Sequence, residues 1–463
     1  MSGHEDTIAA IATAQGGAGI AIIRISGPQS WEVGAKVAGV PVWPREAAGT
    51  FRRATFHSST ADGKTVVMDD GIVLLFAAPR SYTGEDVVEL QCHGGRLQAR
   101  QVLEAALAAG ARPAEPGEFT RRAFLAGRID LARAEAVMDF ISARTERAAA
   151  AARMQMEGRL SRTVDALFDG LVEVHSDIEH LLDFDEGEVP DDFADEAAAA
   201  LGRLRDGLAA LEATWHEGHL LREGALVVIS GRPNAGKSSL MNALLGRDRA
   251  IVSPTPGTTR DSIEESFDAD GIPVRLVDTA GLRDTPSGDI EAEGIARTER
   301  LVNDADLVLR VIDASTPTDD EERGEVAALP RDRTLVVLNK TDVAPPDAVA
   351  AAEASFAGLS LRVRSVSAKT GDNLDGLAHA IGGMLCSAPA ADTPGVSSRH
   401  RREVAQALEA VDEARSRLAD GAEGLVLAAE CLRTAADALG RITGRVWSEE
   451  LLDNIFGRFC VGK

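Results

Sequence analysis

The sequence predicts an α/β nucleotide-binding domain inserted into an all-α helical domain, preceded by a smaller α+β domain. An apolar, β-branched run at 225–230 leads directly into a glycine-rich phosphate-loop motif at 231–238. Helical patterns rich in Ala, Glu and Arg lie on both sides of this module. We therefore expect the flanking helices to pack on one another, because domains are readily inserted where their termini lie close together. The expected boundaries are 1–120 (α+β), 121–221 (helical, first part), 222–384 (nucleotide domain) and 385–463 (helical, second part).

Composition limits the class of protein. The chain has 463 residues, of which 44% are hydrophobic, and a formal charge of −24 at pH 7. Such a charge argues against a general nucleic-acid coat, which needs basic surface, but it allows a local basic patch. No apolar run reaches the ~18 residues of a membrane span, and the first residues lack the pattern of a signal peptide. The four cysteines are scattered, without a C-x-x-C pair, so we expect a cytoplasmic protein with no disulfide framework or zinc site.

The first 120 residues alternate between strand-like and helical patterns. Runs at 19–26, 51–57 and 66–76 are typical of strands, and 96–109 is typical of a helix. Arg24 lies inside the first apolar strand. At such a position an arginine can be an edge-strand residue, a member of a satisfied ion pair or a ligand contact.

Helical patterns extend from residue 116 to about 183, from 192 to 217 and from 399 to about 439. The acidic segment at 183–192, which contains Gly and Pro, predicts a loop between long helices, and 387–397 predicts another. Because no regular heptad repeat is present, we expect a helical bundle rather than a coiled coil.

The phosphate-loop motif Gly231-x-x-x-x-Gly236-Lys237-Ser238 carries the first chemistry. Its glycines let backbone N–H groups converge on phosphate oxygens at a helix N-terminus. Lys237 adds a charge on the β- and γ-phosphates, and Ser238 offers a hydroxyl to Mg²⁺. A chance match of a glycine-rich turn is the alternative, and the preceding strand argues against it.

Further motifs follow in the order that a GTPase requires. Asp278 and Gly281 form D-x-x-G after a predicted strand, so Asp278 would reach Mg²⁺ through water and Gly281 would sense the γ-phosphate. Thr258 and Thr259 lie where switch I should supply a threonine to Mg²⁺, and we assign Thr259 to the metal.

Guanine specificity is expected from the N-K-x-D motif, Asn339-Lys340-Thr-Asp342. A carboxylate accepts two hydrogen bonds from N1 and N2 of guanine, whereas adenine has no such donor pair. Ser367-Ala-Lys369 follows a predicted strand at 361–366 and suits a loop that contacts the base. The residues expected to contact GTP all lie in these motifs: Asn234, Ala235, Gly236, Lys237, Ser238, Ser239, Thr258, Thr259, Asp278, Gly281, Asn339, Lys340, Asp342, Ser367, Ala368 and Lys369.

These motifs, in the forms GRPNAGKSSLMNAL, PGTTRD, DTAGLR, NKTD and SAKTG, resemble the G domain of the TrmE-Era-Der group of bacterial GTPases. Outside them, GIAIIRISG, SYTGEDVVELQCHGG, PGEFTRRAFLAGRIDLARAEAV, HLLREG and the terminal FCVGK resemble the MnmE (TrmE) family of tRNA uridine-modification GTPases. The likeness covers essentially the whole chain. It implies a homodimer that works with the FAD-containing partner MnmG in a hetero-oligomer. It also implies an aminomethyl-type group installed at C5 of the wobble uridine of certain tRNAs, with a one-carbon unit from a 5-formyl or 5,10-methylene derivative of tetrahydrofolate.

The resemblance also implies K⁺-dependent hydrolysis. Leu282 stands where Ras-like GTPases have a water-orienting glutamine, so the attacking water must be activated in another way. The family implies a K⁺ ion between two facing G domains, held by Asn234 and by switch I residues Ser253, Thr255 and Thr258. Without the family, Asn234 would equally fit a loop-shaping role.

The family's catalytic glutamate maps to Glu291, which would orient the attacking water. The loop from Asp278 is one residue longer than the family pattern, and Glu293 stands where an apolar residue is usual. Glu293, or a solvated helix start that contains both carboxylates, therefore remains an alternative.

The N-terminal domain resembles the family's tetrahydrofolate-binding domain. Matched motifs place Arg24, Glu89, Arg128 and Lys463 against the folate, with Arg128 where the family usually has lysine. Cys460, in the family's C-x-G-K tail, would take part in catalysis, although a buried inert thiol is the alternative.

Two other classes of GTPase share parts of this pattern. A ribosome-assembly GTPase would carry a basic RNA-binding module, and a membrane GTPase would carry an amphipathic patch, and the sequence has neither feature. The basic clusters at 399–402 and at Arg121-Arg122 fit either tRNA contacts or, as the simpler interpretation, solvated helix ends.

Overall fold

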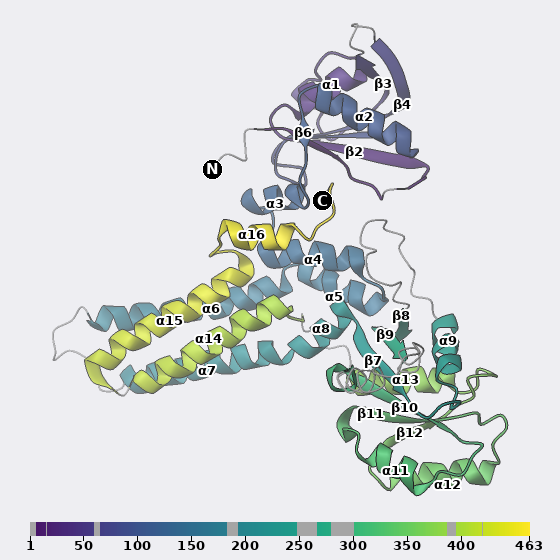
Figure 1. Ribbon diagram of the computed structural model, residues 1–463. Coiled ribbons are helices and arrows are strands. Elements are labelled where there is room, and N and C mark those ends of the chain that lie inside the picture. The colour runs from purple at the N-terminus through teal and green to yellow at the C-terminus, as the bar shows by residue number, and fades with distance from the viewer. Residues whose placement is uncertain are drawn as a thin grey trace, which may run out of the picture.

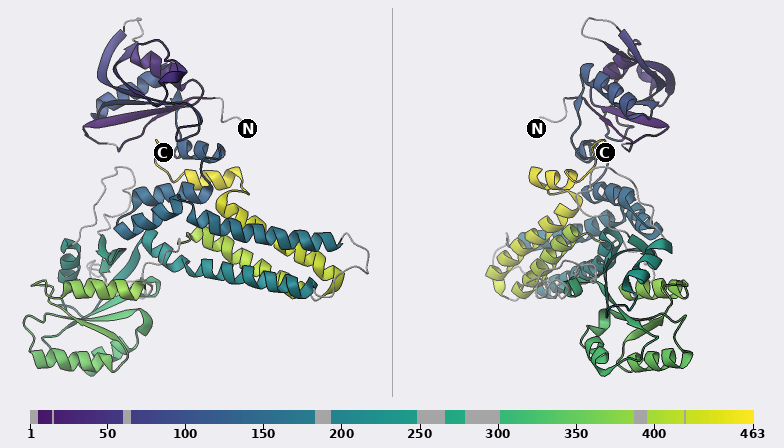
Figure 2. Two further views of the ribbon diagram at one scale, coloured as in Figure 1. Left: turned by 180° about the vertical axis from the view of Figure 1, so that it is seen from behind. Right: turned by 45° about the vertical axis from the view of Figure 1, so that its right-hand side comes forward.

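The computed structural model describes residues 6–14, 16–59, 65–182, 193–247, 266–278, 301–386, 395–418 and 420–463. It consists of two α/β units separated by a helical part, whose long helices extend to one side (Figures 1 and 2). Within the described ranges, no helix combines the length and apolarity that a membrane span requires.

The N-terminal unit is a six-stranded sheet in the order β3-β4-β5-β2-β1-β6. Its elements are β1 (Ile8–Ile11), β2 (Ile20–Ser26), α1 (Ser30–Ala38), β3 (Phe51–Ser59), β4 (Thr65–Phe76), β5 (Val87–His93), α2 (Arg96–Ala108) and β6 (Arg112–Pro113). The predicted strands and the predicted helix are confirmed. Side chains alternate along β2, so Ile23 and Ile25 join the core under α1 and α2 while Arg24 projects from the other face. Because β2 is an interior strand, Arg24 is not an edge-strand residue.

The helical part is built from segments on both sides of the second sheet. Its helices are α3 (Glu118–Leu125), α4 (Leu131–Ser142), α5 (Glu146–Met156), α6 (Arg159–Leu182), α7 (Phe193–Ala213), α8 (Trp215–Glu223), α14 (Ser398–Arg417), α15 (Gly421–Thr443) and α16 (Glu449–Phe456). One buried apolar cluster contains residues of α6, α7, α14 and α15, including Leu171, Leu208, Val411 and Leu432. The predicted bundle is confirmed, but the helical pattern at 399–439 is two helices side by side, separated where Asp-Gly interrupts the pattern (Figure 1).

The second α/β unit has the strand order β12-β11-β10-β7-β9-β8. Its elements are β7 (Ala225–Ser230), α9 (Lys237–Arg247), β8 (Ser266–Ala269), β9 (Ile272–Asp278), β10 (Leu307–Asp313), α11 (Asp320–Ala327), β11 (Thr334–Asn339), α12 (Pro346–Ala357), β12 (Arg362–Ser365) and α13 (Leu374–Leu385). All neighbouring strands are parallel except β8 and β9. The carboxyl ends of β7, β9, β10 and β11 therefore meet at one edge, where such sheets bind ligands.

The C-terminal tail returns to the N-terminal unit (Figure 1). Val461 forms a β-bridge with Pro116, and the Phe119 amide donates to the Lys463 carbonyl over 3.2 Å. A Cβ at Gly462, whose φ is +101°, would lie 2.2 Å from the Ile11 carbonyl oxygen, so only glycine fits there. The end of the chain is thus fixed beside β1, which lies at the other end of the sequence.

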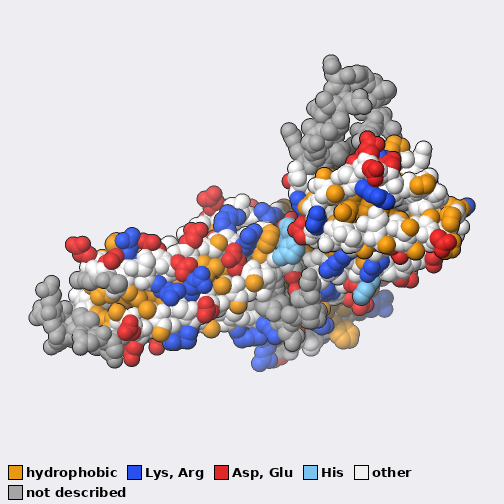
Figure 3. All heavy atoms as spheres, turned by 90° about the horizontal axis from the view of Figure 1, so that it is seen from below, with side chains coloured by type: hydrophobic (Ala, Val, Ile, Leu, Met, Phe, Trp, Pro, Cys, Tyr) orange, Lys and Arg blue, Asp and Glu red, His pale blue; other side chains and the backbone are white. Residues whose placement is uncertain are grey.

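The basic clusters are only partly solvated: Arg401 and Arg402 are exposed in the first turn of α14, whereas the other members are paired. Arg122 is 3% exposed and pairs with Asp6 and Glu118, while Arg121 pairs with Glu449 and Asp453. Arg399 and the fully buried His400 both contact Glu135. On the bundle, positive and negative side chains are interspersed (Figure 3). Most of the basic side chains in the two clusters that the sequence suggested as tRNA contacts therefore form ion pairs within the chain.

Candidate functional site

The phosphate loop follows β7 and ends at α9, as its sequence predicts. Gly231 (φ +152°) and Gly236 (φ +91°) have no room for a side chain: a Cβ would lie 2.3 Å from the Val311 carbonyl oxygen and 2.3 Å from Asn339 Nδ2, respectively. Asn234 adopts a left-handed conformation, with φ +64°. The loop conformation thus depends on glycine at both ends, as phosphate binding by backbone N–H groups requires.

Lys237 and Arg232 stabilise the loop from within. The buried Lys237 ammonium donates to the carbonyl oxygens of Gly231 and Arg232, each over 3.0 Å. Arg232 forms a bidentate ion pair with Asp319, the N-cap of α11, and donates a further hydrogen bond to Glu321. Sequence reasoning missed Arg232, because its partners lie almost ninety residues later in the chain and belong to no motif.

The predicted magnesium groups lie together. Ser238 Oγ donates to Asp278 Oδ2 over 2.8 Å, because β7 and β9 are parallel neighbours with Ile229 opposite Asp278. A hydroxyl and a carboxylate at the start of a phosphate-binding helix are oxygen ligands of the type that Mg²⁺ prefers. The residues present therefore fit Mg²⁺ bound together with nucleotide phosphates.

The base-recognition motifs are connected to the phosphate loop by Asn339. Its buried amide donates to the Ala235 carbonyl over 3.0 Å and accepts from the Ala368 amide over 3.0 Å. Asp342 Oδ1 accepts from Ser367 Oγ over 2.8 Å, so the two base-contacting segments are joined directly. Asn339 thus connects the phosphate loop, the N-K-x-D segment and the Ser367-Ala-Lys369 segment. This role needs a side chain with both a donor and an acceptor, as an amide has.

Lys340 is positioned by Asp313, a second residue that sequence reasoning missed. Lys340 has φ +67°, and its Nζ lies 2.6 Å from Asp313 Oδ2. Burial raises the pKa of Asp313, but hydrogen bonds from Lys340 and Ser315 outweigh it and hold the pKa below its usual value. Its position at the end of an apolar strand was the available signal.

Six further predicted positions lie outside the described residues and stay predictions. They belong to the two switch segments: Ser253, Thr255, Thr258, Thr259, Gly281 and Glu291.

The predicted folate residues Arg24, Glu89 and Lys463 come together on the outer face of the N-terminal sheet. Arg24 Nε donates to Glu89 Oε1 over 2.9 Å across β2 and β5. Burial lowers the pKa of the Lys463 ammonium and Arg24 lowers it further, whereas Cys460 and Glu89 act in the opposite direction. One face thus presents two cations and a carboxylate from parts of the chain more than 370 residues apart.

Two aromatic rings pack near Arg24, the exposed Tyr82 and the fully buried Phe119, and they too were missed. The Arg24 guanidinium carbon lies 5.5 Å from the centre of the Tyr82 ring and 5.7 Å from that of Phe119. Cys460 is exposed rather than buried, so its thiol is accessible beside the tail. The exposed Tyr82 ring, the paired charges and the half-buried ammonium suit a pterin with a carboxylate tail, and these residues therefore fit the cofactor.

Arg128 is placed by the turn between α3 and α4. Its side chain is exposed and packs beside Gly84, which is in the same loop as Tyr82. A Cβ built at Gly84 would lie 3.2 Å from the Arg128 Cγ. It also lines a cavity of about 440 Å³ together with Trp447 and Arg445. The structure thus places Arg128 at the margin of the face that carries Arg24.

Known proteins resemble this chain along its whole length. The family model described as the GTP-binding protein TrmE N-terminus matches residues 7–128, and the MnmE helical domain model matches residues 131–460. A tRNA modification GTPase MnmE of Geobacter sulfurreducens is 43% identical over 465 residues, covering 99% of each chain. The corresponding proteins of Symbiobacterium thermophilum (42% over 464 residues) and Moorella thermoacetica (44% over 473 residues) cover 99% of this chain and 100% of their own. The similarity includes both α/β units and the helices between them.

Proposed function

The chain belongs to the MnmE (TrmE) family of tRNA modification GTPases, and from that premise we propose the reaction in which its GTP hydrolysis takes part. The observation that carries this premise is identity above 40% with MnmE proteins over 99% of the chain. The protein is a GTPase that acts in tRNA modification.

We propose that it installs an aminomethyl-type group at C5 of the wobble uridine of certain tRNAs in the cytoplasm. The one-carbon unit comes from a tetrahydrofolate derivative, and the redox equivalents come from the FAD-containing partner MnmG. The sequence contains no dinucleotide-binding fingerprint of its own, which supports a separate redox partner. Glu89 suits the N–H donors of the pterin, and Arg24, Arg128 and Lys463 suit the carboxylates of its glutamate tail.

In this proposal, residues 1–120 bind folate and form the contact between two copies of the chain. Residues 222–384 are a G domain inserted between the two halves of the helical domain, 121–221 and 385–463. The shared core of α6, α7, α14 and α15 supports this division, because neither half alone buries its apolar faces.

Hydrolysis requires two G domains to meet. Leu282 cannot hydrogen-bond the attacking water, so the chain orients the water with Glu291 and binds a cation through Asn234 and the switch I oxygens of Ser253, Thr255 and Thr258. A bound K⁺ supplies positive charge against the phosphates as negative charge moves toward the leaving group. Ser238 and Thr259 would hold Mg²⁺, which would neutralise charge on the phosphates.

We expect GTP turnover to depend on both the monovalent cation and the protein concentration. In K⁺ the rate per protein molecule should rise with concentration, because G domains pair more often. In Na⁺ of equal ionic strength it should stay low throughout. A phosphate-release assay over a hundredfold range of concentration measures this. Equal rates in both salts at every concentration would contradict the paired, ion-dependent mechanism.

Removing Val461, Gly462 and Lys463 should weaken folate binding at least tenfold and leave GTP turnover within twofold of the intact chain. The tail contributes the Lys463 ammonium and bridges to Pro116, and backbone hydrogen bonds join the end of the chain to Gly117 and Phe119, far in sequence from the phosphate loop. Titration with 5-formyltetrahydrofolate and a phosphate-release assay measure the two effects. Replacing exposed Arg458 with Ala, just before the tail, is the control. Unchanged folate affinity after truncation would contradict the assignment of Lys463.

A further inference from the structure

The N-terminal corner of α5 holds a hairpin of the G domain. The Thr145 hydroxyl donates to the Gly271 carbonyl over 2.6 Å, and Arg144 reaches Ser266 Oγ over 3.4 Å. Thr145 is 7% exposed and also caps α5 by accepting from the Ala148 amide. The corner formed by Arg144, Thr145 and Arg147 is therefore a specific contact between the helical domain and the G domain, and we call it the α4–α5 corner.

The hairpin it holds lies between the two predicted switches. Strands β8 and β9 are joined by Asp270 and Gly271, both with positive φ (+53° and +85°), as in a two-residue type I′ turn. Strand β8 directly follows 251–265, which contains the switch I threonines, and β9 ends at Asp278 of D-x-x-G. A displacement of either switch on change of nucleotide therefore acts directly on this hairpin.

The hairpin cannot slide past the corner easily. A Cβ at Gly271 would lie 2.7 Å from Arg147 Cβ, so the arginine stem is packed against the turn. On its other side, Asp270 Oδ2 lies 2.5 Å from His379 Nδ1 of α13. The turn is thus held by α13 of the G domain on one side and by the corner on the other.

Helix α4 connects the corner to the one-carbon site. Its 12 residues span about 18 Å, from just after Arg128 at its N-terminal end to just before Arg144 at its C-terminal end. Leu131, Ala132, Ala134 and Ala136 are completely buried along it. A helix packed in this way transmits a displacement along its axis with little deformation.

Glu135 fixes the middle of α4 to the second half of the helical domain. Its carboxylate lies 2.8 Å from Arg399 Nε and 2.6 Å from His400 Nε2. Burial raises the pKa of Glu135, but Arg399 and His400 outweigh it and hold the pKa well below its usual value, so the carboxylate stays charged. Helix α4, which residues 128–130 directly precede, is therefore fixed to the start of α14.

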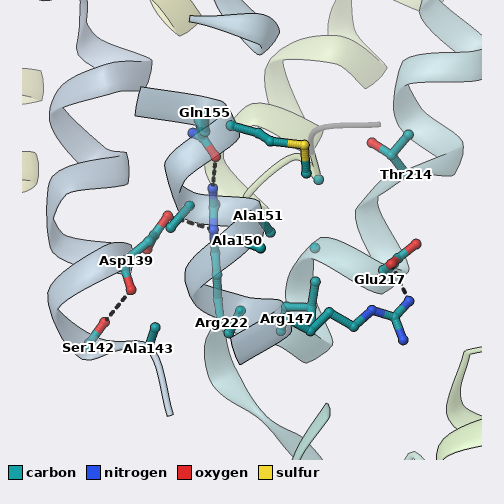
Figure 4. A pocket seen from close by; sticks show the side chains of 16 residues that line it. Asp139, Ser142, Ala143, Arg147, Ala150, Ala151, Gln155, Thr214, Glu217 and Arg222 are labelled. Carbon is teal, nitrogen blue, oxygen red and sulfur yellow. Dashed lines mark hydrogen bonds and ion pairs between the residues drawn. The ribbon is translucent and has the colours of Figure 1, made fainter. Parts of the chain in front are cut away.

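Beside the corner, a cavity of about 270 Å³ separates α4 and α5 from α8 (Figure 4). It is crossed by two ion pairs, Arg147–Glu217 at 2.5 Å and Arg222–Asp139 at 2.8 Å. Because this side of the corner is hollow, the corner can shift relative to α8 without displacing a packed core. Helix α8 leads directly into β7 and the phosphate loop, so the cavity lies where relative movement of the two domains would occur.

We propose that the α4–α5 corner and helix α4 couple the nucleotide state of the G domain to folate affinity at the one-carbon site. Thr145 is the positioning residue of this connection, acting through the β8–β9 hairpin at one end and Arg128 at the other. The inference rests on the proposed function, because it presumes that both sites bind their ligands. Coupling of this kind is reciprocal: whatever nucleotide state favours folate, folate favours that state by the same factor.

The test is a titration of the full chain with 5-formyltetrahydrofolate, once with GDP and once with a non-hydrolysable GTP analogue in K⁺. For the unaltered chain we expect the two dissociation constants to differ by about fivefold or more. Thr145→Asp keeps the cap on α5, since a carboxylate also accepts from the Ala148 amide, but it cannot donate to the Gly271 carbonyl. The ratio should then fall to about one, while the affinity for GDP stays within twofold. Thr145→Ser restores the hydroxyl donor and should restore the ratio.

Thr163→Asp is the matched control, because Thr163 is an exposed residue of α6 whose hydroxyl donates to the Arg159 carbonyl of the same helix. It should leave the ratio unchanged. A ratio preserved in Thr145→Asp, or a ratio of one in the unaltered chain, would overturn the inference and leave the proposed function intact. Absence of folate binding by the unaltered chain would overturn both. Should Thr145→Asp fail to fold, Arg144→Ala decides: a reduced ratio supports the coupling and an unchanged one overturns it.

Discussion

Replacement of Asp342 by asparagine is expected to lower the affinity for GTP on the order of 10⁴-fold and to create a preference for XTP. Guanine presents donors at N1 and N2, and both need an acceptor. Asparagine has one oxygen acceptor and one NH₂ donor, so its NH₂ group faces one of these guanine donors. Neither of those two donors then has an acceptor. Xanthine has a carbonyl in place of the 2-amino group, so the same amide donates to it and accepts from N1.

The substitution should leave the hydrogen bond between Asp342 and its neighbour in the base site intact. Its Oδ1 accepts from Ser367 Oγ, and an amide oxygen can accept the same bond. Competition of GTP and XTP against a fluorescent GDP analogue measures the exchange of specificity. Asp347→Asn, the same change at an exposed position on α12, should leave GTP affinity unaltered. Retention of GTP affinity by Asp342→Asn would contradict the assignment of the base site.

Glu291→Ala is expected to lower GTP turnover about 10²- to 10³-fold while leaving GTP affinity within twofold. A carboxylate that orients the attacking water acts in the transition state and contributes little to binding the nucleotide, so its loss reduces the turnover number alone. Leu282, at the position where Ras-like GTPases have a water-orienting glutamine, has no hydrogen-bonding group and cannot take over the role. Single-turnover hydrolysis in K⁺ and nucleotide titration measure the two quantities.

Glu293→Ala separates the two candidate carboxylates. With Glu291 as the water-orienting group, Glu293→Ala should lower turnover less than fivefold. A larger loss in Glu293→Ala than in Glu291→Ala would move the role two residues along the chain, as the extra residue in this loop allows.

Much of the fold was predictable because the signals are local. The strand at 225–230 and the glycines at 231 and 236 specify a phosphate loop through backbone sterics that operate over a few residues. The single helical pattern at 399–439 shows the limit of such reasoning. Periodicity detects the apolar faces of α14 and α15, whereas the direction in which each helix packs depends on its partners α6 and α7.

The candidate sites divide in the same way. Asp342, Asn339 and Lys237 were identifiable because each lies at a set distance from a strand end in a motif. Arg232 and Asp313 were not, because ion pairs form between side chains that only folding brings together. Likewise the basic cluster at 399–402 has the composition of a nucleic-acid contact, but Glu135 and Glu212, from α4 and α7, neutralise two of its arginines.

By itself the sequence determined that this protein binds and hydrolyses a guanine nucleotide and belongs to a tRNA-modifying family, because those properties reside in short motifs whose chemistry is local. Only the tertiary structure decided that Arg399 pairs with Glu135 of α4 and that Thr145 holds the hairpin between the switches. Both contacts join segments more than 100 residues apart, and their positions follow from how the helices pack rather than from any local pattern.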